Sequence, residues 1–251
     1  MFLGGIGLKQ VENNNQQLIK STIAFAKALD ALRFSPPITH IYNPFCYAWK
    51  PHELYLKKYA RPFKEVVFLG MNPGPWGMAQ TGIPFGEVNA VRDWLGITAE
   101  VEQPLRLHPD RPITGFNCKR SEVSGRRLWG LFKERFHTAE IFFKDHFVAN
   151  YCPLLFYNAQ GQNITPNKLK GGEKDMLFER CDQYFRVLID ILQPEWVVGV
   201  GIFAQERATE ALEDYPMKIT RIPHPSPANP AANGGWAPLV SAILLDTEMW
   251  T

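Results

Sequence analysis

The stretch EVVFLGMNPGPWGMAQTGIPFG, which spans Glu65–Gly86, joins a short apolar segment to a turn rich in glycine and proline. The segment EVVFLG has the apolar character of a buried strand. Asn72 follows directly after it, at the place where a parallel sheet presents its functional groups. An asparagine amide neither loses nor gains a proton near neutral pH. Whatever chemistry occurs at this position therefore has to use an uncharged side chain.

Three other segments share this strand-like character and are separated from one another by helical patterns. They are Asp145–Ala149 (DHFVA), Trp196–Val200 (WVVGV) and Lys218–Ile222 (KITRI). Apolar residues recur at helical spacing in the segments that begin at Asn14, Leu128, Met176 and Ile202. This alternation of strands and helices predicts an α/β fold with a short parallel sheet.

The length of 251 residues predicts a single domain. Residues 1–63 are expected to form an N-terminal helix and an irregular wrap rich in proline and aromatic residues, and residues 64–245 the core. The composition, 45% hydrophobic and 21% charged, is that of an ordinary globular protein. A chain of this size needs no disulfide or metal ion to stabilise its core.

Charge, cysteine content and the chain start narrow the class of protein. The net charge is only +2, so binding to nucleic acid would require a local concentration of positive charge. The four cysteines are widely spaced and form no C-x-x-C pattern, which indicates free thiols and no zinc or iron–sulfur site. No convincing signal peptide or transmembrane run is present. We expect a soluble, intracellular monomer without membrane contacts, cytoplasmic in a bacterium and nuclear in a eukaryote.

Polar residues follow three of the four expected strands. Asn72 follows the first strand in GMNPGP, Asn150 follows the second in FVANYCP, and His224 follows the fourth in RIPHPSPANP. Each residue alone is compatible with an ordinary turn. Because ligands of parallel sheets bind outside the carboxyl ends of the strands, their joint placement predicts a functional site.

Several other types of site fit the sequence less well. GVGIFA (Gly199–Ala204) matches the dinucleotide pattern G-x-G-x-x-A, but the next strand ends in Pro223 and His224 instead of an acidic residue for the ribose. A dinucleotide-binding α/β enzyme stays an alternative, although close packing of a helix on its strand also explains these glycines. The sequence has no Walker A lysine after GMNPGPWG, no G-x-S-x-G and no acidic pair in its motifs. Glu87 fits a helix cap.

Five segments resemble the single-strand-selective monofunctional uracil-DNA glycosylases, a branch of the uracil-DNA glycosylase superfamily. They are YNPFCYAW, GMNPGPWGMAQTGIPFG, NCKRSEVSGRRLWG, NYCPLLF and HPSPANPAANGGW. The resemblance extends from Tyr42 to Trp236. It implies a three-layer α/β/α sandwich with a four-stranded parallel sheet, and an enzyme that uses no metal and no cofactor. It also implies hydrolytic excision of uracil and oxidised uracils, such as 5-hydroxymethyluracil, from single- and double-stranded DNA, which leaves an abasic site for base excision repair.

The resemblance assigns roles to the residues of the expected site. Asn72 corresponds to the asparagine that positions the attacking water, and His224 to the histidine that supports negative charge on the leaving uracil. Asn150 corresponds to the residue that reads the edge of uracil. The other residues of the base-binding pocket are expected to be Phe85, which stacks on the flipped base, with Met71 and Gly74.

Two further segments are expected to contact DNA. The first is the basic cluster KRSEVSGRR, whose residues Lys119, Arg120, Ser124 and Arg126 suit phosphate contacts. The second is the wedge loop SPANPAANGGW, with Ser226, Pro227, Ala228, Asn229 and Asn233. An arginine is common in the family at the position of Ala228, and a phenylalanine at that of Trp76; the first departure bears on the wedge and not on the chemistry. A non-catalytic protein that reads single-stranded DNA is the other class of function compatible with these motifs.

Overall fold

The computed structural model describes residues 4–250, and within them the core is a parallel sheet with strand order β3–β2–β6–β7. All four strands coincide with predicted segments to within one residue at either end. Their bounds are β2 Val66–Gly70, β3 His146–Asn150, β6 Trp196–Val200 and β7 Lys218–Ile222. The apolar runs of β2, β3 and β6 are buried because both faces of the sheet are covered, whereas the edge strand β7 is partly exposed, unlike the buried strand that its sequence was expected to form. Gly70 pairs with Asn150 in the register of β2 and β3, so the ends of these two strands lie side by side.

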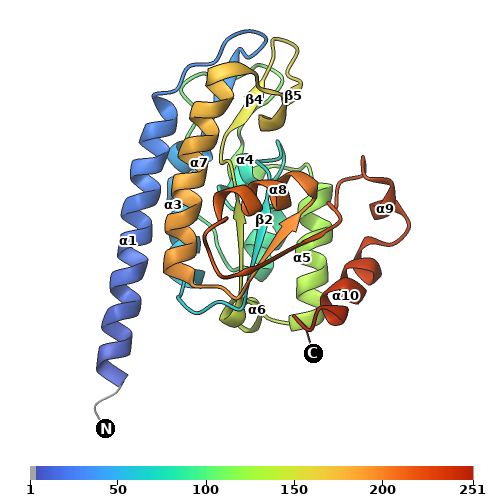
Figure 1. Ribbon diagram of the computed structural model, residues 1–251. Helices are drawn as coiled ribbons and strands as arrows, with labels where there is room; N and C mark the ends of the chain where they lie inside the picture. Colours follow the sequence, from blue (N-terminus) through green and yellow to red (C-terminus); the bar gives the residue numbers. More distant parts are fainter. Residues whose placement is uncertain (1–3, 251) are drawn as a thin grey trace.

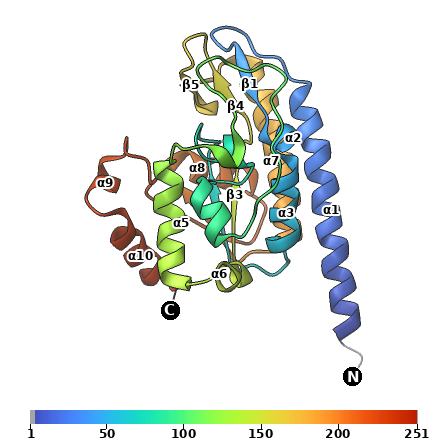
Figure 2. The same ribbon diagram turned by 180° about the vertical axis from the view of Figure 1, so that it is seen from behind.

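Helices cover both faces of this sheet and make the expected three layers (Figures 1 and 2). On one face, Phe68 of β2 lies 4.9 Å, ring centre to ring centre, from Phe132 of α5. On the other face, Tyr55 of α3 lies 5.1 Å from Phe147 of β3. The first helical layer comprises α5 (Val123–Phe136), α6 (Ala139–Asp145) and α10 (Trp236–Asp246); the second comprises α3 (Trp49–Tyr59), α7 (Gly171–Leu192) and α8 (Ile202–Ala211).

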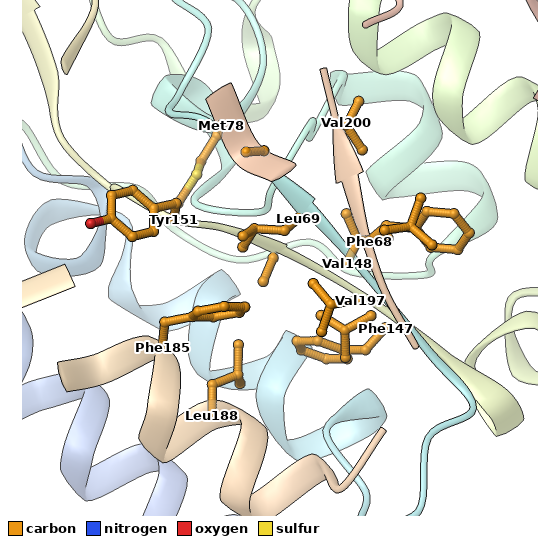
Figure 3. Close-up of a cluster of buried hydrophobic side chains, with 14 of the residues drawn as sticks. Phe68, Leu69, Met78, Phe147, Val148, Tyr151, Phe185, Leu188, Val197 and Val200 are labelled. Carbon is orange, nitrogen blue, oxygen red and sulfur yellow. The ribbon is translucent and has the colours of Figure 1, made fainter. Parts of the chain in front are cut away.

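The core is filled by large apolar side chains between sheet and helices. Figure 3 shows Phe185 and Leu188 of α7 directed toward the strands that carry Leu69 and Val197. These four side chains are at most 3% exposed. The long helix α1 (Gly4–Asp30) packs outside α7, where Phe25 stacks on Tyr184 at 4.3 Å. Apolar burial of this kind fixes the sheet whose carboxyl edge carries the polar residues predicted from the sequence.

The prediction of an irregular wrap before residue 64 is wrong for much of that segment. It contains β1 (His40–Tyr42), α2 (Pro44–Tyr47) and the 11-residue helix α3. Pro51 lies in the first turn of α3, where the missing N–H is not needed for a helical hydrogen bond. β1 belongs to a second, antiparallel sheet of order β1–β4–β5, which the sequence did not reveal. Its other strands are β4 (Leu155–Tyr157) and β5 (Asn163–Ile164).

The remaining elements are short. They are α4 (Met78–Thr81), α9 (Pro230–Asn233), a π-helical turn at Ala90–Trp94 and 3-10 turns at Gly115–Asn117 and Pro166–Lys168. The four cysteines carry free thiols, as predicted. Among residues 4–250 no helix is both long enough and apolar enough to cross a membrane.

Candidate functional site

The carboxyl ends of β2 and β3 bring three predicted residues together around Gly70. A Cβ atom added to Gly70 would lie 2.3 Å from Asn150 Oδ1 and 2.6 Å from Phe85 Cε2. No side chain therefore fits at this position, and the Asn150 amide and the Phe85 ring occupy the space directly above the strand end. His224, which follows β7, joins the group because its ring centre lies 6.1 Å from that of Phe85.

Phe85 is held in an unusual backbone conformation. Its φ angle is 52°, in the left-handed region that side chains other than glycine rarely adopt. Its carbonyl oxygen accepts hydrogen bonds from Trp129 Nε1 at 3.0 Å and from the Glu87 N–H at 2.7 Å. Glu87 also caps the following helical turn, as predicted, since its carboxylate accepts from the Ala90 N–H at 2.9 Å. These contacts fix the aromatic ring at the sheet edge, and local strain of this kind is characteristic of functional sites.

Asn150 keeps a free hydrogen-bond acceptor inside the protein. The residue is 8% exposed, and its Nδ2 donates only to the sulfur of Met78 at 3.1 Å. Its Oδ1 is buried without a partner. Buried polar atoms are nearly always hydrogen-bonded, and leaving one unpaired costs about 1–3 kcal/mol. An unpaired amide oxygen at a strand end is therefore suited to accept a hydrogen bond from a ligand.

Asn72 is oriented by the loop that follows β3. Its Nδ2 donates to the carbonyl of Leu154 at 3.2 Å, which leaves Oδ1 as the unused acceptor of this half-buried side chain. The backbone supports this arrangement, because the Cys152 N–H donates to the Met71 carbonyl at 2.9 Å. Met71 itself is half-buried beside Asn72. The Oδ1 atom can thus hold a water molecule by accepting a hydrogen bond from it.

His224 is present as the neutral imidazole. The N–H of Ser226 donates to its Nδ1 at 3.1 Å, so Nδ1 carries a lone pair and the ring proton resides on Nε2. Burial lowers the pKa of His224 to about 4, because the protonated ring would lose its hydration. Near neutral pH the side chain can therefore act as an uncharged N–H donor.

Gly74 contacts a carboxylate that the sequence analysis did not single out. An added Cβ at Gly74 would lie 2.3 Å from Glu122 Oε2, and the same oxygen accepts from the Trp76 N–H at 3.1 Å. Burial raises the pKa of Glu122 above its usual range. Glu122 thus joins the basic cluster to the loop that carries Asn72. A single acidic residue within the run KRSEVSGRR was the available signal.

The predicted wedge loop is braced by its own asparagines. Asn229 donates to the His224 carbonyl at 2.9 Å and caps α9 by accepting from the Ala231 N–H at 3.3 Å. Asn233 donates to the Pro227 carbonyl at 2.9 Å. Ser226 Oγ accepts from the N–H of Ala228, whose methyl group is exposed.

Arg127 ties this loop to helix α5, a role that was not predicted. Its guanidinium donates to the Pro225 carbonyl at 2.8 Å and to Asn233 Oδ1 at 3.3 Å. The two predicted DNA-binding segments are therefore joined through one side chain. Pro225 follows His224 directly, so Arg127 also restrains the chain next to the imidazole.

The basic cluster lies at the start of α5. Lys119, Arg120 and Arg126 are exposed, and Ser124 is half-buried. Arg126 donates to Ser121 Oγ at 3.2 Å, and none of these three cations forms a salt bridge with a side chain of residues 13–250. Unpaired cations beside the site are available to phosphate groups.

The glycines of GVGIFA are explained by packing. A Cβ at Gly199 would lie 2.4 Å from the backbone nitrogen of Gln205, so α8 could not approach β6 so closely with any larger residue. Gly201 has a φ angle of 96°, and a Cβ there would lie 3.2 Å from that of His224. The described residues contain no group of three or more histidine, cysteine or acidic side chains arranged to hold a metal ion.

Comparison with known proteins finds a family match over the part of the chain that contains the site. The model of the Uracil DNA glycosylase superfamily matches residues 57–238. The single-strand selective monofunctional uracil-DNA glycosylase of Rattus norvegicus is 48% identical over 210 residues, which cover 83% of this chain and 76% of the rat protein. The Mus musculus protein of that name is 47% identical over 83% of this chain and 75% of its own.

A solved structure supports the fold at lower sequence similarity. SMUG2 of Pedobacter heparinus superimposes with a TM-score of 0.66 at 19% identity, covering 92% of this chain and 97% of that structure. Identity near one half over most of the chain, together with the superfamily match, establishes the relationship. The chain belongs to the uracil-DNA glycosylase superfamily and, within it, to the single-strand selective monofunctional uracil-DNA glycosylases.

Proposed function

We propose that this chain excises uracil from DNA by hydrolysis of the glycosidic bond and leaves an intact abasic site. The observation that carries the proposal is the group around Gly70. It combines an unpaired buried acceptor on Asn150, an aromatic ring on Phe85, a neutral N–H donor on His224 and a free amide oxygen on Asn72. These are the groups that recognise a planar base and stabilise its departure.

The leaving base requires stabilisation of negative charge. When the bond from the sugar C1′ to uracil N1 breaks, the electron pair passes to the base and spreads onto its carbonyl oxygens. The Nε2–H of His224 can donate to the oxygen that gains this charge. A single donor of this kind is worth about 3–4 kcal/mol in an acyl-transfer enzyme. A neutral donor suits this role because Nδ1 is already occupied by the Ser226 N–H.

The attacking water requires orientation more than deprotonation. Departure of the base leaves a cationic sugar, to which even a neutral water adds readily. Asn72 Oδ1 would hold that water while its Nδ2 stays fixed to Leu154, and holding reactants in place is itself a large catalytic factor. After attack, the water proton passes to the uracil anion and the sugar keeps the hydroxyl group. An amide is thus sufficient at the position where Asn72 lies.

Recognition of the base falls to Asn150 and Phe85. Asn150 Oδ1 would accept from uracil N3–H and Nδ2 would donate to O4, while Phe85 stacks on the flipped ring. Cytosine presents the reverse pattern of donor and acceptor on that edge. The base has to leave the helix stack to reach these groups. We extend the proposal to oxidised uracils and to both single- and double-stranded DNA.

The absence of strand cleavage is part of the proposal. Cleavage would need an amine that forms a Schiff base with the sugar, and Asn72, Asn150 and His224 supply none. Burial lowers the pKa of Lys64 to about 8, but this lysine precedes β2 at the opposite end of the sheet, where its Nζ donates to the Phe143 carbonyl. We also propose that the basic cluster and the wedge loop make the contacts with DNA. A single copy of the chain is sufficient for the reaction.

Uracil release from labelled oligonucleotides tests the proposal. Single-turnover assays should detect an abasic site in single- and double-stranded DNA that contains one uracil or one 5-hydroxymethyluracil. Borohydride should trap no covalent protein–DNA adduct at levels comparable with turnover. Binding of DNA without base release would instead favour a non-catalytic reader, and a trapped adduct would contradict the monofunctional mechanism.

A further inference from the structure

An aromatic and cationic group lies beside the site and has no role in the chemistry proposed above. The Arg120 guanidinium carbon lies 4.3 Å from the centre of the Trp76 ring. The corresponding carbon of Arg111 lies 5.9 Å from the Trp76 ring and 5.7 Å from that of Tyr157. We call Trp76, Arg111 and Arg120 the Trp76 platform.

The inner part of the platform is fixed by hydrogen bonds. The backbone N–H of Trp76 donates to the Glu122 carboxylate at 3.1 Å, and Arg111 Nε donates to the Gly161 carbonyl at 2.7 Å. Tyr157 is a buried residue of β4. The antiparallel sheet therefore supports the platform through Arg111, and a surface held in this way loses little conformational freedom when it binds a ligand.

The outer part of the platform is Arg120, which is exposed to solvent and has no acidic partner among the described residues. Arg120 is exposed, and its guanidinium makes no hydrogen bond or salt bridge with any part of the chain that the structure describes. The carboxylate nearest in sequence is Glu122, which already accepts from Trp76. A flat ring covered by an unpaired planar cation suits a ligand that offers both a planar face and a negative charge.

Resting on the proposed function, we propose that the Trp76 platform stacks an unpaired base next to the excised uracil in single-stranded DNA. Trp76 lies four residues after Asn72 in the same loop, so a nucleotide bound there belongs to the same stretch of strand. Unpaired bases stack on aromatic rings and on arginine planes with little regard to sequence. In a duplex the neighbouring base stays paired in its own stack, so the platform favours single strands.

Binding measurements on paired variants test this proposal independently of catalysis. Single-stranded oligonucleotides with 2′-fluoro-2′-deoxyuridine, which resists hydrolysis, are compared with the same oligonucleotides carrying tetrahydrofuran abasic analogues on both sides of the uridine. The variants are Trp76→Ala, Trp76→Phe and Arg120→Ala. Lys218→Ala is the matched control, because Lys218 covers Trp196 at 4.9 Å at the opposite end of the sheet. Duplex versions of each oligonucleotide complete the set.

The proposal predicts a specific pattern of dissociation constants. Trp76→Ala and Arg120→Ala should weaken single-strand binding by roughly tenfold, with little change for duplex, and Trp76→Phe should keep most of the affinity. The loss should disappear when the neighbouring bases are absent. Equal losses on single strands and duplex, or losses that persist with abasic neighbours, would overturn the proposal. Failure of the wild-type protein to release uracil would reject the proposed function and leave this binding comparison intact.

Discussion

The two sheets of this protein lie in different parts of the molecule and contribute different features to it: in Figure 1 the antiparallel strands β4 and β5 lie at the top, and β2 of the parallel sheet lies in the centre. The carboxyl edge of the parallel sheet holds side chains with unused hydrogen-bonding atoms, such as Asn150 Oδ1 and the Nε2–H of His224. The antiparallel sheet β1–β4–β5 supports a half-buried cation beside an aromatic ring, Arg111 next to Tyr157. The first arrangement suits recognition and reaction of one base, and the second suits attachment of the strand. Reaction and binding should therefore be separable by mutation.

The largest effects are expected at the parallel sheet. Asn72→Ala and His224→Leu should each lower the single-turnover rate by roughly 10²-fold or more, because each removes a group that acts in the transition state. Binding of single-stranded DNA should change by only a few-fold. Asn167→Ala, at an exposed asparagine, is the control and should leave both quantities unchanged. Near-wild-type rates in both site variants would remove the proposed mechanism.

Asn150→Asp sharpens the distinction between recognition and reaction. Replacing Nδ2 with an oxygen removes the donor to uracil O4, so uracil release should fall by roughly 10²-fold. A carboxylate can accept from the amine of cytosine, so weak cytosine release should appear. The measurement is abasic-site formation in a single strand whose only target is one cytosine. Asn150→Ala is the matched control, which should lose uracil activity and gain none on cytosine.

Full uracil activity of Asn150→Asp without cytosine release would place Asn150 outside the recognition step. The fall in uracil activity has to be separated from a loss of folding, because the new carboxylate is buried next to Met78. Urea unfolding of both variants provides that separation.

Arg127→Ala is expected to have a smaller effect, confined to the wedge loop. The variant loses the hydrogen bonds to Pro225 and Asn233, so the loop is less ordered when it enters a duplex. KM for duplex DNA should rise by about 3- to 10-fold, with less change for single strands. Arg126→Ala removes a neighbouring cation that donates to Ser121 Oγ and not to the wedge loop, and it should affect both substrates alike. If Arg127→Ala instead raised KM equally for duplex and single-stranded DNA, this loop would not be a wedge.

The parallel sheet was predictable because its signals are local. Three of its strands, β2, β3 and β6, are short apolar runs. Asn72, Asn150 and His224 lie at or just after the ends of strands, so chain order alone indicated that they would meet. The antiparallel sheet gave no such signal. β5 has only two residues and β1 three, and the pairing of His40 with Tyr157 joins positions far apart in the chain. Pairing of that kind depends on the folded core and not on local pattern.

The same limit applies to the site residues that the sequence analysis missed. Glu122 and Arg127 lie inside a run that reads as a solvated basic segment, and their roles come from tertiary contacts with Trp76 and Pro225. Gly74 was expected in the pocket through the family resemblance, but its missing side chain makes room for Glu122. Where a residue acts through a distant backbone group, the sequence around it carries no trace of the partner.

The smallest expected effect is that of pH on the reaction rate. By contrast, we expect pH to change the stability of the fold. Burial lowers the pKa of His52, His146 and His224 to about 4, below the ordinary value near 6.5. Between these values the unfolded chain binds protons that the folded chain does not. The contribution of these histidines to the free energy of unfolding should therefore be constant above about pH 6.5 and should fall as the pH is lowered toward 4.

The reaction should be nearly independent of pH over the upper part of that range. Because His224 stays neutral and keeps its proton on Nε2, the single-turnover rate at saturating DNA should be flat from about pH 8 to about pH 5. The measurement needs constant ionic strength, since DNA binding is sensitive to salt. A rate that changes with a midpoint near pH 6.5 would mean that His224 titrates in the complex and acts as a cation. A flat rate, beside a stability that falls in acid, would show that the donor at the sheet edge is uncharged.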